Sequence, residues 1–570
     1  MMHIMNDISD IPLYLKTCIS AAVERVGISV PIDSIRVETP ADMMHGDYAT
    51  NIALAEAKCA GKNPRILAEE IVAHMSVADT YGAIAEVSVA GPGFINITLA
   101  REVILARLAR AVETGYGYAE ERTGDTVVVE YTDPNPFKPF HIGHLMTNII
   151  GESLARLFEA RGDTVVRMNY QGDVGLHIAK ALYGMREFNV SPDDIEGIGR
   201  AYVYGNTVYT ESDEAKDTID AINAHIYARD DEALNAVYDA GRATSLAHFE
   251  EIYAKLGTTF DAYVFESETW KKGRDAVMAR VGDVFTESNS AIVYHGEEEG
   301  LHTRVFITAS GLPTYETKDI GLALLKLERY PEATMYYTMT AEEQTDYFKV
   351  VFAALNAMVP ASRGRFVHMP HGMMRIAEGK MSSRLGNVIF GEALLADMTA
   401  RAAEKLLENG TDDTDGSKAN AIAVAALKYG ILRQETGKNI VYEPERWMSF
   451  EGASGPYVQY TAVRAASVVT KAIEAGIVPD ITVGSEDIGV LERLIARFPE
   501  DVRIASALRA PHAIVTAVTE IAQAFNAYYA HHVIVSDSLE APYRVALAQA
   551  VASTLTSGLG LLGISVPERM

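Results

Sequence analysis

Cysteine is scarce in this chain. Only Cys18 and Cys59 occur among 570 residues, and neither lies in a C-x-x-C pair. A cysteine-rich zinc site is therefore excluded and a disulfide framework is not expected, so both are interpreted as small buried apolar residues. This cysteine usage fits a reducing compartment, and we expect a cytoplasmic protein.

Long hydrophobic runs are also lacking. No stretch of 18 or more apolar residues occurs, so no membrane span is expected. The first residues, MMHIMNDISD, show no basic segment followed by an apolar core, and they do not predict a signal peptide.

Basic residues are outnumbered by acidic ones. Lys and Arg total 50 against 77 Asp and Glu, which gives a formal net charge of −27. This balance argues against a protein that coats nucleic acid non-specifically. It leaves open an enzyme that binds one RNA through local basic patches, and acidity also simply supports solubility. Net charge therefore does not decide the function.

Four regions differ in their pattern. Residues 1–118 mix helical and strand-like segments and predict a small α/β domain. In residues 119–399 the order strand Thr126–Tyr131, helix His144–Arg161, strand Thr164–Tyr170 predicts a right-handed βαβ unit in a parallel sheet. Residues 185–300 within this region are acidic and mostly helical, and we interpret them as an insertion. Residues 400–450 predict a helical connector, and residues 451–570 predict an all-helical bundle.

The segment Glu130–Leu145, EYTDPNPFKPFHIGHL, follows a predicted strand and opens a predicted helix. In open α/β sheets ligands bind at the carboxyl ends of strands, and a helix N-terminus there offers free N–H groups to phosphates. Gly143 lets the backbone approach a nucleotide closely. His141 and His144 can donate hydrogen bonds to phosphate oxygens as charge develops in a transition state. The segment therefore predicts a nucleotide site.

Two histidines three residues apart can also play simpler roles. They can be capping or packed residues, or two ligands of a metal at helical spacing. No third ligand lies nearby in the sequence, so a metal is the least favoured alternative and we predict no dedicated metal site.

The same segment resembles the first hallmark of class I aminoacyl-tRNA synthetases, His-Ile-Gly-His. Their second hallmark, Lys-Met-Ser-Lys-Ser, is matched from Lys380 to Arg384, 239 residues after His141 (380 − 141). A basic Gly/Ser-rich loop suits a mobile phosphate clamp, although a lone Lys-Met-Ser is common in surface loops. The resemblance implies a Rossmann-type catalytic domain that binds ATP through His141, Gly143, His144, Lys380, Met381 and Ser382.

The surrounding residues resemble arginyl-tRNA synthetases in particular. The resemblance implies ATP with Mg²⁺, L-arginine and an arginine tRNA as partners, and we expect a monomer. It implies that Tyr315 and Asp319 hold the guanidinium and that Gln344 lies near the α-amino group. The implied arginine-binding residues are Glu130, Asp133, Asn135, His141, Tyr315, Asp319 and Gln344, and the implied catalytic residues are His141, His144, Lys138 and Lys380.

The chemistry of such a site is sensible by itself. A guanidinium presents five donors in a fixed fork, which two carboxylates, Glu130 and Asp319, can engage in a bidentate manner. Lysine cannot satisfy both acceptors, and such sites discriminate by roughly 10⁴-fold or more without editing. Taken singly, each carboxylate is more often part of a structural ion pair.

Segments at both ends extend the resemblance. His45–Leu54 (HGDYATNIAL) and Ala90–Ile97 resemble the domain that contacts the tRNA elbow, where Phe94 and Asn96 match D-loop contacts. These two residues flank Ile95 and share one face of a strand, which permits a surface role, although Phe94 could equally be core. The C-terminal region resembles the family's anticodon-binding domain, with Tyr457, Tyr460, Arg464 and Met570 as implied contacts, although aromatic residues at helical spacing are more often core.

Some positions depart from the family pattern. Ser383 replaces the second lysine of the second hallmark, and either Arg384 or Lys138 could supply the missing charge. Lys138 stands just before the first hallmark, where many arginyl enzymes carry a lysine, so we predict that it neutralises phosphate charge. Asp133 stands where many relatives have Ser, and Ala462 where the family often has His.

Two alternative functions compete with this interpretation. One is another class I synthetase: a cysteinyl enzyme would want a zinc site, and a glutamyl enzyme places the first hallmark near its N-terminus. The other is a catalytically silent relative that binds RNA. Such a protein would be expected to lose one of the hallmarks, and both remain here.

Overall fold

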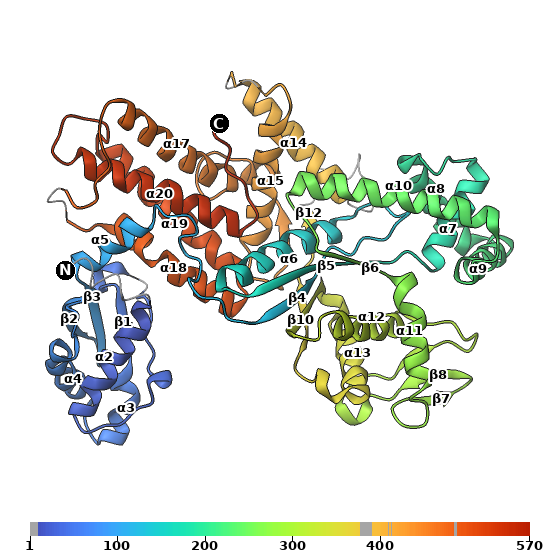
Figure 1. Ribbon diagram of the computed structural model, residues 1–570, viewed down its shortest axis with the longest axis horizontal. Coiled ribbons are helices and arrows are strands. Elements are labelled where there is room, and N and C mark those ends of the chain that lie inside the picture. Colours follow the sequence, from blue (N-terminus) through green and yellow to red (C-terminus); the bar gives the residue numbers. More distant parts are fainter. Residues whose placement is uncertain (1–9, 41, 377–389, 409, 412, 484–486) are drawn as a thin grey trace.

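The computed structural model describes residues 10–570 except 41, 377–389, 409, 412 and 484–486. The predicted site residues Lys380, Met381 and Ser382 lie outside the described residues, as do Ser383 and Arg384. In Figure 1 the N-terminal domain (blue) lies below the C-terminal helices (red), and the helices α7–α9 lie at the opposite end of the molecule.

The N-terminal domain combines an antiparallel sheet, with the strand order β1-β3-β2, with the helices α2, α3, α4 and α5. Two of its helices begin at side chains that accept a backbone N–H: Asp10 accepts from Leu13 N at the start of α2, and Asn63 accepts from Arg65 N just before Pro64 at the start of α4. The elements are α2 (Ile11–Arg25), β1 (Tyr48–Thr50), α3 (Ile52–Ala60), α4 (Pro64–Ala78), β2 (Ile84–Ala90), β3 (Phe94–Leu99) and α5 (Arg101–Arg110).

The central domain is built on a five-stranded sheet with the order β11-β10-β4-β5-β6, in which every pair of neighbours is parallel. The chain moves outward from β4 to β5 and β6, then returns to the other side of β4 for β10 and β11. The strand order therefore reverses between β4 and β10, which is where open α/β sheets bind ligands. The strands are β4 (Thr126–Glu130), β5 (Thr164–Gln171), β6 (Ala262–Phe265), β10 (Ala333–Ala341) and β11 (Phe366–His371).

Helix α6 (Ile142–Arg161) connects β4 to β5 and ends at Gly162, whose φ of 100° stops the helix. The expected βαβ unit is thereby confirmed, and so is the predicted class: a parallel-sheet α/β domain with a small N-terminal α/β domain and a C-terminal helical bundle.

The region expected as one insertion, residues 185–300, contains β6, which is a strand of the main sheet. Two separate additions therefore flank β6, and this four-residue strand is too short to stand out by periodicity. The first consists of α7 (Leu176–Phe188), α8 (Ile195–Glu211), α9 (Asp213–Ala228) and α10 (Glu232–Leu256). The second consists of α11 (Glu266–Met278), a small antiparallel sheet and α12 (Tyr315–Arg329). The strands of that sheet are β7 (Thr286–Ser288), β8 (Ala291–Tyr294) and β9 (Arg304–Ile307). Helix α13 (Thr345–Met358) follows β10.

The connector is mostly helical but includes β13, which pairs in parallel with β12. The helical bundle that follows shares one continuous hydrophobic core with the connector, α6 and the N-terminal domain. No helix among the described residues is long and apolar enough to cross a membrane. The elements are β12 (Met374–Ile376), α14 (Gly391–Glu408), α15 (Ser417–Leu432), β13 (Ile440–Tyr442), α16 (Pro444–Trp447), α17 (Gly455–Glu474), α18 (Val490–Leu508), α19 (Pro511–His531) and α20 (Ala541–Leu561).

Candidate active site

Two histidines cap the N-terminus of α6 and each other. His141 Nδ1 accepts the backbone N–H groups of Gly143 (3.1 Å) and His144 (3.4 Å), while His144 Nδ1 accepts that of His141 (3.2 Å). Their rings stack with centroids 3.4 Å apart. Because each Nδ1 acts as an acceptor, the proton of each neutral ring resides on Nε2. The pair therefore presents two Nε2–H donors at a helix N-terminus.

Both imidazoles are held in the neutral form. Burial lowers the pKa of His141 to about 4, and the nearby Lys138 ammonium contributes to this shift. Burial also places the pKa of His144 well below its usual value, with His141 and Lys138 adding to the effect. Lys138 itself has a pKa lowered chiefly by burial, and its Nζ lies 5.4 Å from the ring centroid of Tyr202. This end of α6 is thus cationic and rich in donors.

A group of buried carboxyl groups gathers around Glu130 at the end of the same strand. Glu130, the last residue of β4, is 4% exposed, and its Oε2 accepts hydrogen bonds from Lys326 Nζ and from Thr338 Oγ1. The partner Lys326 is only 2% exposed and comes from α12. Glu130 therefore already has an internal cationic partner, which the sequence did not suggest.

Burial, together with the negative charge of Glu130, raises the pKa of two further carboxyl groups, those of Asp319 and Asp133. The pKa of Asp319 is raised to about 8, first by burial and then by the charges of Glu130 and Glu266. Burial also raises the pKa of Asp133 well above its usual range, with Glu130 and Asp319 contributing. Among the described residues, neither Asp133 nor Asp319 forms an ion pair, and the charge of Lys326, which pairs with Glu130, lowers the pKa of each only in part.

Neutral donors orient these two groups. Tyr347 Oη donates to Asp319 Oδ2 at 2.5 Å, and the backbone N–H of Tyr170 donates to Asp133 Oδ1 at 2.7 Å. Tyr315 lies one helical turn before Asp319 on α12, so the predicted spacing places both on one face of the helix. Tyr347 belongs to α13 and became visible as a partner only in the structure.

A buried ion pair borders this group of carboxylates. Glu266 Oε2 accepts from Lys318 Nζ at 2.6 Å, with side chains 6% and 5% exposed, and its charge influences both Asp319 and Lys138. Glu266 follows β6 directly. It lies within the segment Leu256–Ser267 whose sequence resembles the arginyl family, which was the only signal in the sequence that could have identified it.

The loop between β4 and α6 is strained. Thr132, Asp133 and Phe137 have φ values of 82°, 47° and 66°, a region that residues other than glycine seldom occupy. Asn148 Nδ2 donates a hydrogen bond to Thr132 Oγ1 at 3.0 Å. A Cβ at Gly172 would lie 2.1 Å from Asn135 Oδ1, so any side chain after β5 would displace Asn135 from its position. Neighbouring elements therefore impose the conformation of this loop, as is common at functional sites.

The remaining predicted residues lie at the margins. Tyr315 is 60% exposed, and the side chain of Gln344 is exposed in the 3₁₀ turn Glu342–Gln344 that follows β10. Phe390, the first described residue after position 389, pairs with His141 in an antiparallel bridge, and Gly391 N donates to Phe140 O at 2.9 Å. The chain therefore returns to the N-terminus of α6 directly after the second hallmark.

Three of the predicted anticodon contacts, Tyr457, Tyr460 and Arg464, lie on α17, where they meet residues of α19. Arg464 donates to Tyr460 Oη and to Asn526 Oδ1, each at 3.2 Å, and its guanidinium lies over the rings of Tyr460 and Tyr529. Asn526 Nδ2 in turn donates to Tyr457 Oη at 2.9 Å. Asn526 and Tyr529 were missed because aromatic and amide residues on a bundle helix look like core in a sequence. Met570 packs partly buried against the bundle core.

The two predicted elbow contacts differ in exposure. Phe94 is 43% exposed at the start of β3, which excludes a core role, whereas Asn96 on the same face is only 9% exposed. The shared strand face thus leaves Phe94 open and Asn96 mostly covered by its neighbours.

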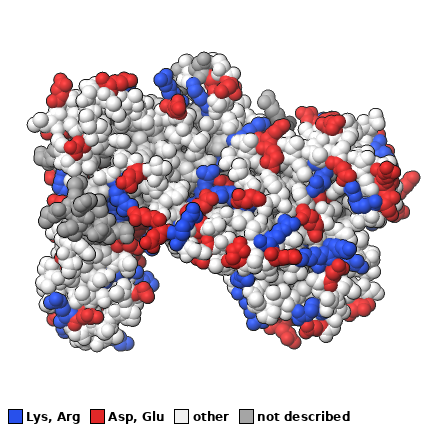
Figure 2. Space-filling view, viewed as in Figure 1, with Lys and Arg blue, Asp and Glu red and all other residues white. Residues whose placement is uncertain are grey.

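Figure 2 shows basic and acidic side chains interspersed over the viewed face.

Family models cover most of the chain. The model described as "tRNA synthetases class I (R), catalytic domain" matches residues 108–443, "Arginyl tRNA synthetase N terminal domain" matches residues 13–99, and "DALR anticodon binding domain" matches residues 458–570. The first match alone spans more than half of the 570 residues.

Curated relatives and solved structures agree with these models. Arginine–tRNA ligase of Bacteroides thetaiotaomicron is 30% identical over 585 residues, covering 95% of this chain and 97% of the relative. That of Exiguobacterium sibiricum is 30% identical over 543 residues, covering 94% and 95%. The structure of Thermus thermophilus arginyl-tRNA synthetase superposes with a TM-score of 0.78 at 24% identity, covering 98% of this chain and 100% of that one, and shows the same fold.

Proposed function

Because this chain belongs to the arginyl-tRNA synthetases of class I, we propose that the polar groups around the carboxyl end of β4 form its active site. The protein attaches arginine to tRNA at the expense of ATP. The single observation that carries the site assignment is that a donor-rich α6 terminus and a group of buried carboxylates occur together after the carboxyl end of β4.

Charge balance supports an arginine site. Among the four carboxyl groups Glu130, Asp133, Glu266 and Asp319, two have internal lysine partners, Lys326 and Lys318. Asp133 and Asp319 remain without such partners among the described residues. Arginine carries two positive groups, the guanidinium and the α-ammonium, so its binding would supply each carboxylate with the cation that favours its ionised form. We assign the guanidinium to Asp319, whose neighbour Tyr315 would cover it, and the α-ammonium to the side of Asp133 and Gln344.

The α6 terminus supports ATP binding. In the first step an oxygen of the arginine carboxylate attacks the α-phosphorus of ATP, the bond from that phosphorus to the bridging oxygen breaks, and pyrophosphate leaves. The Nε2–H groups of His141 and His144 donate to phosphate oxygens, and Lys138 adds positive charge. Gly143 keeps the helix N-terminus open to the nucleotide. In the second step a terminal ribose hydroxyl of the tRNA attacks the arginyl-adenylate carbonyl, and AMP leaves.

Mg²⁺ fits this scheme as a companion of ATP. Among the described residues no group of three or more His, Cys, Asp or Glu could hold a metal ion. Mg²⁺ commonly takes most of its ligands from phosphates and water, so we propose that it enters with ATP as a substrate complex. We also propose that the protein works as a cytoplasmic monomer, which the scarcity of cysteine supports for the compartment.

Lys138→Ala should lower the turnover of arginine activation far more than it weakens arginine binding. The Lys138 charge acts on His141, and among the described residues Lys138 forms no ion pair although the charge of Glu266 also acts on it, so its loss should chiefly remove phosphate stabilisation. We expect kcat for pyrophosphate exchange to fall about a hundredfold, with the Kd for arginine changing less than about threefold. An unchanged kcat would exclude this role, and Lys180→Ala, a lysine of α7 that bonds Asn206, is the matched control.

Arginine binding should strengthen with rising pH. Below its pKa of about 8 the Asp319 carboxyl is protonated in the free protein, whereas the guanidinium requires the carboxylate. The affinity should therefore increase about eightfold from about pH 7 to about pH 8.5, with release of about one proton per arginine bound at pH 7. Calorimetry in two buffers of different ionisation enthalpy measures both.

The Tyr347→Phe variant tests the origin of this pH dependence. It removes the hydroxyl that lowers the pKa of Asp319, so the affinity profile should move to higher pH. A profile that stays in place would show that a different group titrates.

The function as a whole is tested by pyrophosphate exchange with each amino acid, with and without total tRNA. Exchange with arginine alone supports the assignment, and exchange with another amino acid would redirect it to a different synthetase. Absence of exchange from folded protein under every condition would favour an RNA-binding protein without catalysis.

A further inference from the structure

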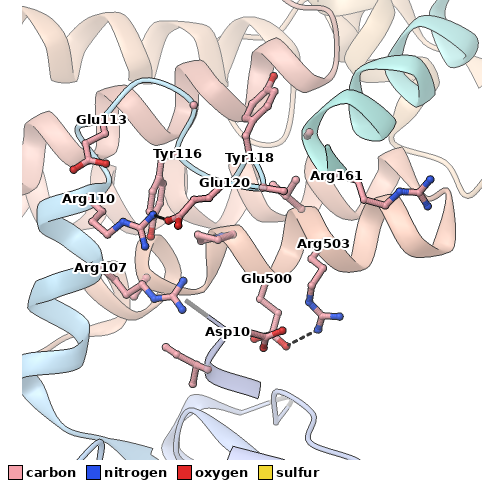
Figure 3. Close-up of a pocket in the computed structure, with 18 of the residues that line it drawn as sticks. Asp10, Arg107, Arg110, Glu113, Tyr116, Tyr118, Glu120, Arg161, Glu500 and Arg503 are labelled. Atoms are coloured by element: carbon pink, nitrogen blue, oxygen red, sulfur yellow. Dashed lines mark hydrogen bonds and ion pairs between the residues drawn. The ribbon is translucent and has the colours of Figure 1, made fainter. Parts of the chain in front are cut away.

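The N-terminal domain meets the rest of the protein around a cavity. This cavity has a volume of about 750 Å³ and lies between β1, α5, residues 113–121 and α18. Figure 3 shows Arg107 and Arg110 of α5 on one side, and Glu500 and Arg503 of α18 facing them. Contacts at the margin of this space add to the shared hydrophobic core in holding the N-terminal domain in its orientation.

Two consecutive residues of the N-terminal domain make such contacts. Asp47 Oδ1 accepts a hydrogen bond from Arg493 Nη1, and Tyr48 Oη donates to Glu500 Oε2 at 2.7 Å. Arg493 and Glu500 are seven residues apart (500 − 493) on α18, so they lie two turns apart on one face of the helix. The Asp47 side chain is 8% exposed, and Tyr48 and Glu500 are 4% and 9% exposed. Charged hydrogen bonds sheltered from water in this way are strong and directional.

The local sequence fixes Asp47 before it reaches α18. Gly46 has a φ of 98°, and a Cβ there would lie 2.7 Å from Ile97 O, so the turn requires glycine. Asp47 Oδ2 accepts the backbone N–H of Leu99 at 2.7 Å. One carboxylate oxygen is thus bound to its own domain and the other to the bundle. The segment His45–Leu54, which no step of the reaction uses, therefore has a structural role.

We propose that Asp47, Tyr48, Arg493 and Glu500 form a domain clamp that sets the distance between the two tRNA-contacting surfaces. These are positioning residues, since their hydrogen bonds cross the domain junction and none of them reaches the groups at the end of β4. The role rests on the proposed function, in which the surface at Phe94 and the surface at Arg464 contact one tRNA. Two linked binding surfaces reinforce each other only when their spacing matches the ligand.

Electron–electron distance measurements test the clamp directly in the full chain. Cys59 on α3 is exposed, so the interpretation of both cysteines as buried was wrong for this one, and it takes one spin label, while Cys18 is buried. Ile473→Cys, at a position of α17 that is 57% exposed, provides the second. The Tyr48→Phe, Arg493→Gln double variant should broaden the distance distribution. Arg497→Gln is the matched control, because this arginine of α18 pairs with Asp501 and Glu520 within the bundle. An unchanged distribution in the double variant would overturn the clamp.

Aminoacylation kinetics then test whether the clamp sets the spacing that tRNA binding needs. The double variant should raise the KM for tRNA about tenfold, while kcat and the KM values for arginine and ATP stay within about twofold. A broadened distribution with an unchanged KM for tRNA would instead overturn the tRNA surface assigned to the N-terminal domain, and with it the spacing role.

Discussion

Asp319→Asn is expected to reduce kcat/KM for arginine by about a thousandfold. Losing one partner of a desolvated charged contact costs roughly 2–5 kcal/mol, and each 1.4 kcal/mol is about tenfold. The amide has nearly the same size, but its NH₂ group would face the donors of the guanidinium. Tyr347, which donates to Asp319 at 2.5 Å, would also lose a charged acceptor. Pyrophosphate exchange at varied arginine concentration, with tRNA present, measures this effect.

The Asp319→Asn substitution should weaken the use of arginine and leave that of ATP unchanged. The KM for ATP should change little, because Asp319 lies with the carboxylates and not at the α6 terminus. Glu316→Gln serves as the control, since it removes the same charge from the same helix at a residue that pairs with Arg304 at 3.1 Å. Wild-type arginine kinetics in Asp319→Asn would refute the assignment of the guanidinium.

His141→Asn should reduce kcat for arginine activation by about a hundredfold or more while leaving the fold intact. Asparagine is among the best N-cap residues, so its oxygen can replace Nδ1 as the acceptor for the N–H groups of Gly143 and His144. It cannot supply the Nε2–H donor. Removing one donor to a developing charge costs about 10²–10³ in rate. The arginine KM should change little.

A comparison at the same position separates capping from donation. His141→Ala removes both the acceptor and the donor, and should also lower the unfolding free energy by about 1 kcal/mol. Thermal unfolding and single-turnover adenylate formation measured on both variants distinguish the roles. Full activity in His141→Asn together with low activity in His141→Ala would mean that the histidine acts only as a cap.

The sequence by itself determined the regular elements and the reaction class. The helix beginning near His141, the flanking strands and the four bundle helices follow from periodicity and capping residues, because local backbone preferences and one-sided burial are written in neighbouring positions. The first hallmark lies in the predicted turn between strand β4 and helix α6. Tyr315 and Asp319 share a helix face for the same local reason.

Only the tertiary structure decided which charges meet. Lys326 lies 196 residues from Glu130, and Arg493 lies 446 residues from Asp47, so no local pattern could pair them. Residues 185–300 divided around β6 because a four-residue strand gains its place from its neighbour β5 rather than from its own sequence. The raised pKa of Asp319 likewise arises from burial among distant carboxylates. Nearby residues determine the secondary structure, whereas the burial and pairing of charged side chains depend on the tertiary packing of the whole chain.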